Sequence, residues 1–95
     1  MKIKEEEAKF IITPTALLKV EESYPEFDFL KLLREALTEN KEPKMSDYFK
    51  VLYVGYIGAK PEEEITFDEF LKLLEEIDFG EITQVGVKLL TERKN

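Results

Sequence analysis

The chain has no cysteine, no histidine and no tryptophan among its 95 residues. The absence of cysteine excludes disulfides and thiol nucleophiles. The absence of histidine as well excludes zinc sites of the usual kind and the commonest general base. No apolar run approaches the ~20 residues that a membrane-spanning helix needs. No positively charged start leads into an apolar segment, as it would in a secretory signal. We therefore expect a cytoplasmic protein with no membrane partner.

Basic residues are also few. The 14 Lys and Arg against 21 Asp and Glu leave a net charge of −7. This balance argues against a nucleic-acid partner or an anionic membrane surface, since both require clustered Lys and Arg. It favours a basic or apolar helical partner, whose encounter with the protein the charge would accelerate. The hydrophobic fraction of 43% is sufficient for one core, so we expect a single domain over residues 1–95.

The first twelve residues predict a short β ribbon or a flexible arm. In the ribbon, Lys2–Lys4 would pair with residues 8–12 across three glutamates. A two-stranded ribbon by itself is marginal in water. The helical core is expected over residues 13–92.

Helix starts are marked by residues whose side chains cap free backbone N–H groups: Thr13, Asp28, Ser46 and Thr66. Pro14 suits the first helical position, and the Tyr24–Pro25 pair should end the first helix. Gly80 is expected as the C-cap of the fourth helix, with a fifth beginning at about Glu81. The second helix is predicted to bury one apolar face: Phe29, Leu30, Leu33, Ala36 and Leu37. The fold class is therefore mainly α, a single small domain of four to five helices with a short N-terminal ribbon.

The stretch ITFDEF, residues 65–70, resembles the end of an EF-hand calcium loop. With Glu69 at the twelfth loop position, the third falls on Lys60 and the sixth on Glu63. The loop needs an oxygen ligand at the third position and a glycine at the sixth. Thr66 and Glu69 instead match a capping box, in which each side chain accepts a hydrogen bond from the other's backbone N–H. We interpret the stretch as a capped helix start and expect no metal and no cofactor.

Enzyme signatures are lacking too. Adjacent glutamates such as those at 62–64 predict a solvated acidic face. Gly55 and Gly58 lack the G-K-[ST] context of a phosphate-binding loop. We expect Gly55 at a helix contact and Gly58 at a helix end. Neither serine lies in the Asp-Ser-Leu attachment motif of an acyl carrier. We predict a protein without catalytic residues.

The third predicted helix, which follows Ser46, is apolar over most of its circumference. A helix of this kind must be covered on both sides. Five short helices would leave part of its surface uncovered for a partner or a second subunit. Tyrosine suits such an interface, because its ring is apolar and its hydroxyl can stay in contact with water. The predicted partner-binding surface, which could also mediate self-association, consists of four residues: Tyr48, Val51, Tyr53 and Tyr56. The alternative is that these side chains belong to the core.

The order of parts resembles the small tail assembly chaperones of long-tailed bacteriophages and prophages of Gram-positive hosts. The segments that carry the resemblance are FIITPTALLKVEESY, MSDYFKVLYVGYIGA and ITFDEFLKLLEEIDF, with a Leu-rich helix after the first and an amphipathic helix at the end. The resemblance implies a protein that binds the helical, aggregation-prone tape measure protein in the host cytoplasm and is absent from the mature virion. It carries no binding residues over to this chain. It also implies a longer form made by ribosomal frameshifting, and Arg93–Asn95 are compatible with slippery codons.

A second class stays open, an acidic regulatory interaction module such as an antitoxin-like or DNA-mimicking inhibitor. Its carboxylates would have to line up on one face, and its binding would fall steeply with added salt. Capture of an apolar client would fall much less. Salt dependence therefore separates the two hypotheses.

Overall fold

The computed structural model of the chain describes residues 1–91, so the frameshift expectation at Arg93–Asn95 lies outside the described residues. The described chain contains a two-stranded ribbon and five helices: β1 Lys2–Ile3, β2 Glu6–Glu7, α1 Pro14–Ser23, α2 Phe29–Thr38, α3 Met45–Ala59, α4 Phe67–Leu73 and α5 Phe79–Thr91. The prediction of a mainly α fold with a short N-terminal antiparallel ribbon is confirmed.

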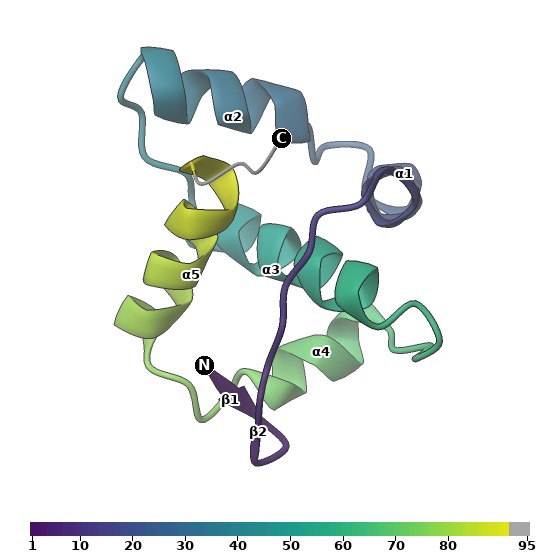
Figure 1. Cartoon of the computed structure of the whole chain (residues 1–95). Coiled ribbons are helices and arrows are strands. Elements are labelled where there is room, and N and C mark those ends of the chain that lie inside the picture. Colours follow the sequence, from purple (N-terminus) through teal and green to yellow (C-terminus); the bar gives the residue numbers. More distant parts are fainter. Residues whose placement is uncertain (92–95) are drawn as a thin grey trace.

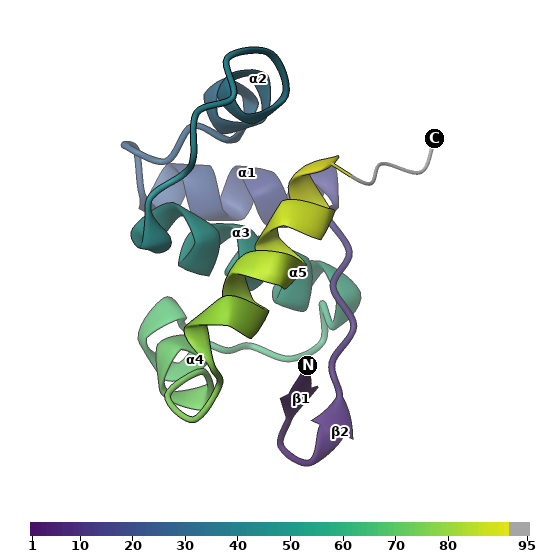
Figure 2. The ribbon, with the colours of Figure 1, turned by 90° about the vertical axis from the view of Figure 1, so that its left-hand side faces the viewer.

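The central element is α3 (Figure 1). It packs most extensively against α5 and α1, while α4 also lies against it. The outermost helix is α2, which contacts α5 at one end of the molecule (Figures 1 and 2). Eight residues of α3 are buried: Tyr48, Val51, Leu52, Tyr53, Val54, Gly55, Tyr56 and Ile57. A helix that is apolar nearly all round is thus covered nearly all round, as the cost of exposing apolar surface requires.

The N-terminal ribbon forms, but its second strand is not the predicted one. Antiparallel pairing joins β1 to β2. Lys4 and Glu5 have φ angles of 55° and 64°, as a two-residue type I′ hairpin turn requires. Residues 8–12 were predicted as the second strand, and they instead run as an extended segment over α3 (Figure 1). The Ile11 N–H donates to the Gly55 carbonyl oxygen at 2.9 Å.

Two glycines of α3 allow this segment to approach closely. A Cβ at Gly55 would lie 2.9 Å from the Cβ of Phe10, and a Cβ at Gly58 would lie 2.0 Å from the carbonyl oxygen of Ile11. The prediction that Gly55 makes a helix contact is confirmed, because a Cβ there would also lie 3.3 Å from Leu89 Cδ1 of α5. The prediction that Gly58 ends the helix is wrong, because α3 continues to Ala59 and Gly58 instead makes room for a crossing backbone.

We expect Gly58→Ala to destabilise the protein, although alanine is the better helix former. The gain in helix propensity is about 1 kcal/mol at most. The new methyl group meets a backbone carbonyl that cannot rotate away, and overpacking of this kind costs about 1–3 kcal/mol. Urea unfolding followed by circular dichroism should therefore show a lower midpoint.

The control is Gly80→Ala, whose methyl group would meet only the carboxylate end of Asp78. The shift of this carboxylate weakens the cap at the start of α5, and the gain in helix propensity offsets part of that loss, so the urea midpoint should fall less than in Gly58→Ala. A Gly58→Ala variant at least as stable as the wild type would contradict the close approach of the N-terminal segment.

Three of the four predicted helix caps are confirmed. Thr13 and Asp28 each accept a hydrogen bond from the backbone N–H three residues on, at 3.2 and 3.0 Å. The capping box is complete: Thr66 Oγ1 accepts from the Glu69 N–H at 3.1 Å, and Glu69 Oε1 accepts from the Thr66 N–H at 2.9 Å. The hydrogen bond from the Thr66 N–H to the Glu69 carboxylate is the main cause of the lowered pKa of Glu69. The segment that resembles a calcium loop is therefore a capped helix start.

Two predicted helix boundaries are wrong for a common reason, which is that a nearby aspartate caps the helix instead. Helix α3 starts one residue before Ser46, and Asp47 accepts a hydrogen bond from the Lys44 N–H at 3.3 Å. Gly80 does not end α4 but lies in the first turn of α5. Its N–H donates to Asp78 Oδ2 at 3.1 Å. Asp78 therefore caps the start of α5, at the position where Gly80 was expected to end α4.

Candidate functional site

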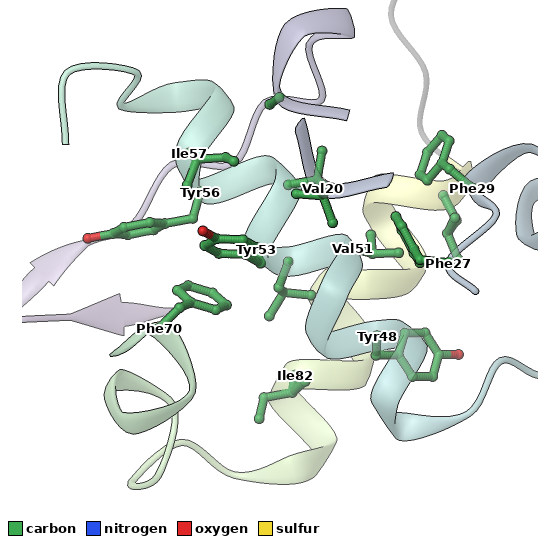
Figure 3. Packing of buried hydrophobic residues seen from close by; sticks show 14 of the residues in the cluster. Val20, Phe27, Phe29, Tyr48, Val51, Tyr53, Tyr56, Ile57, Phe70 and Ile82 are labelled. Carbon is green, nitrogen blue, oxygen red and sulfur yellow. The ribbon is translucent and has the colours of Figure 1, made fainter. Parts of the chain in front are cut away.

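The four residues predicted to bind a partner lie in the core. Their exposed fractions are 3% for Tyr48, 0% for Val51, 6% for Tyr53 and 1% for Tyr56. The expectation that part of α3 stays uncovered is therefore wrong. The prediction considered only helices as cover for α3. The extended segment 8–12 also covers it, together with α1, α4 and α5. Figure 3 shows Tyr53 and Tyr56 facing Phe70, with Tyr48 at the other end of the helix.

Packing and hydrogen bonds inside the protein hold the side chains of Tyr53 and Tyr56 in place. Their ring centroids lie 5.6 and 5.2 Å from that of Phe70. The Tyr53 hydroxyl donates to the carbonyl oxygen of Ile65 at 2.6 Å, and the Tyr56 hydroxyl donates to Glu63 Oε1 at 3.4 Å. Burial raises the pKa of both tyrosines. Both rings thus attach α4 and the loop before it to α3, and neither offers a free face to a partner.

Tyr48 differs from the other three because its ring also lines an open groove. The ring lies against Gly86 of α5, where an added Cβ would come 2.4 Å from Tyr48 Cδ1. Two adjoining depressions meet at the ring, with volumes of about 540 and 250 Å³, and both are lined by Tyr48, Val87 and Glu42. We call them together the α5 groove. It runs between α5 and the connector that joins α2 to α3.

The α5 groove has an apolar floor and a charged rim. The floor includes Val85 and Val87, and Val87 remains 44% exposed. Glu42, Glu81 and Lys88 contribute charges to its lining. Burial, with a smaller contribution from the charge of Glu42, raises the pKa of Tyr48. An apolar floor with a polar rim is the usual composition of a protein-binding surface.

Large apolar side chains are also exposed outside the groove: Ile11, Leu18, Leu30, Leu37 and Phe79. Leu30 and Leu37 were predicted to be buried and are instead 69% and 54% exposed. The buried face of α2 is formed by Phe29, Leu32 and Leu33. The outward side of α2 is therefore apolar as well.

Within residues 1–91, no cluster of three or more acidic side chains is placed to hold a metal ion. In the segment that resembles a calcium loop, Lys60 Nζ lies 3.7 Å from Glu63 Oε2. An ion pair thus occupies two positions that a calcium loop would use otherwise. None of the helices in the described part of the chain is both long enough and apolar enough to span a membrane.

Sequence reasoning found Tyr48 but missed Val87 and the part played by Gly86. A glycine inside a predicted helix is a signal of close packing, and Gly86 was such a glycine. The partner of that packing could not be read from the sequence, because Tyr48 lies 38 positions earlier in the chain. Comparisons with protein-family models, with curated proteins and with solved structures give no match, so the case for a function rests on the α5 groove and on the sequence.

Proposed function

We propose that the protein is a non-catalytic tail assembly chaperone whose α5 groove binds an apolar segment of a helical client. The client is the tape measure protein of a long-tailed bacteriophage or prophage, met in the host cytoplasm before the virion is complete. The observation that carries the proposal is an open, apolar-floored groove on a small acidic helical domain. The identity of the client comes from the resemblance in the order of the helices.

The physical properties of the groove suit transient cover of a client. Val85 and Val87 offer an apolar floor to the side chains of an amphipathic helix, while Tyr48, which is 3% exposed, adds little surface to it. Full burial of one leucine-sized side chain contributes about 1.5–3 kcal/mol. A few such contacts give an affinity that later tail components can displace. The net charge of −7 accelerates encounter with a basic client.

Val87→Glu should weaken client binding by roughly tenfold or more, since it places a carboxylate on the groove floor. The measurement is co-expression and co-purification with the product of a long, helix-rich reading frame downstream, followed by titration of the purified pair. The matched control is Leu18→Glu, because Leu18 is similarly exposed (59%) but lies on α1 and outside the groove. It should bind as the wild type does.

Two outcomes would count against the proposal. Unchanged binding by Val87→Glu would show that the groove is not the client site. Failure of the wild type to bind or solubilise any such helix-rich product would remove the chaperone function itself. Binding to another partner that falls steeply between about 0.05 M and about 0.5 M NaCl would favour the acidic regulatory module instead.

A further inference from the structure

The outward side of α2 carries an apolar stripe between basic residues. Leu30, Arg34 and Leu37 follow one another at helical spacings of four and three, so they share a face. Lys31 flanks them, and all four side chains are exposed. We call these four residues the α2 patch. It exposes two leucines that the core has left uncovered.

The α2 patch is positively charged on an acidic protein. Within residues 1–91, neither Lys31 nor Arg34 forms an ion pair. Glu35 is the one acidic residue of α2, and it lies 3.8 Å from Lys41 Nζ. The patch therefore combines apolar surface with two positive charges that form no ion pair among the described residues.

The turn between α4 and α5 has the opposite character. Phe79 is 66% exposed there, although it is one of the largest apolar side chains in the protein. It is preceded by the exposed acidic residues Glu75, Glu76 and Asp78, and residues 73–81 contain no basic residue. We call these four residues the turn patch. Its charge is opposite to that of the α2 patch, and each patch exposes apolar surface.

We propose that the α2 patch of one copy binds the turn patch of a second copy, so that copies of this chain associate head to tail. The leucines of α2 cover Phe79, and the two basic side chains face the three carboxylates. Figures 1 and 2 both place α2 at one end of the molecule and the α4–α5 turn toward the other. Hydrophobic cover and charge pairing then act at the same contact.

The geometry of this contact determines the kind of assembly. The two patches differ, so the interface is heterologous, and every added copy leaves one patch of each kind free. Such a contact extends into an open chain unless the rotation closes a ring. It also differs from the self-association through the tyrosines of α3 expected from the sequence, since those side chains are buried. The inference does not rest on the proposed client.

The experiment is sedimentation equilibrium of the full chain over a concentration series, with one variant of each patch. The α2 variant is Leu30→Ser with Leu37→Ser, and the turn variant is Phe79→Ser. All three positions are exposed, so circular dichroism should show an unchanged fold. The control is Leu18→Ser, an exposed leucine outside both patches.

We expect the mass of the wild type and of Leu18→Ser to rise with concentration beyond that of two chains. Each patch variant alone should remain at the monomer mass. An equimolar mixture of the two variants should reach twice the monomer mass and stop there, because one intact patch of each kind remains. A monomeric wild type, continued self-association of Phe79→Ser alone, or a mixture that stays monomeric would each overturn the proposal.

Discussion

Tyr56→Glu is expected to unfold the protein at neutral pH. Tyr56 is 1% exposed, and its ring lies against Phe70 and Phe10, at centroid distances of 5.2 and 6.4 Å. A carboxylate in its place would lie among apolar rings and beside Glu63, and Lys60 Nζ, 5.6 Å from the ring centroid, would offset only part of the cost of burying it. The penalty for an uncompensated buried charge is several kcal/mol. The whole stability of a domain is about 5–15 kcal/mol.

Tyr56→Phe is the matched control, because it keeps the ring and removes only the hydroxyl. It loses one hydrogen bond to an accessible carboxylate, which costs about 0.5–1.5 kcal/mol. Thermal unfolding followed by circular dichroism should show a cooperative transition for Tyr56→Phe and none for Tyr56→Glu. A cooperative transition at the wild-type temperature for Tyr56→Glu would contradict the burial of Tyr56. Loss of partner binding on a Glu substitution at Tyr53 or Tyr56 would accordingly report unfolding.

Phe70→Ala is expected to cost about 3–5 kcal/mol of the free energy of unfolding. Phe70 is 0% exposed and packs against the rings of both Tyr53 and Tyr56. Helix α4 has only seven residues. A helix of this length is not stable alone in water, so α4 depends on the burial of its apolar side. Each kcal/mol lowers the Tm of a domain of this size by roughly 4–8 °C.

The control for this prediction is the same substitution at an exposed position. Phe79→Ala removes an identical group from a side chain that is 66% exposed, and its effect should stay within about 0.5 kcal/mol. Both variants are compared by urea unfolding at low protein concentration, where association plays no part. Equal losses in the two variants would mean that α4 does not pack on α3 as described.

The α5 groove, the α2 patch and the turn patch have no residue in common. Val87→Glu therefore tests client binding without changing either patch, and Phe79→Ser tests self-association without changing the groove. A protein that fails one test can still pass the other. The two proposals can thus be rejected separately.

The sequence by itself determined the features that depend on a few neighbouring residues. The caps at Thr13, Asp28 and Thr66 are hydrogen bonds to a backbone N–H three residues on, so their geometry is local. The central place of α3 followed from its apolar circumference, since such a helix must be covered. The predicted start of α3 was wrong because two neighbouring residues could cap it. Asp47 accepts the capping hydrogen bond, and Ser46 was the predicted cap.

The tertiary structure alone decided what covers α3 and what stays open. The segment through Ile11 crosses Gly55, and Tyr48 settles on Gly86, in each case between residues far apart in the sequence. Neither contact produces a periodic pattern in the sequence, because each depends on how whole elements pack against one another. For the same reason the predicted surface of α3 became core, while Leu30 and Leu37, predicted to be buried, became surface. Periodicity shows that a helix has an apolar face, but only packing against distant residues decides how much of that face is covered.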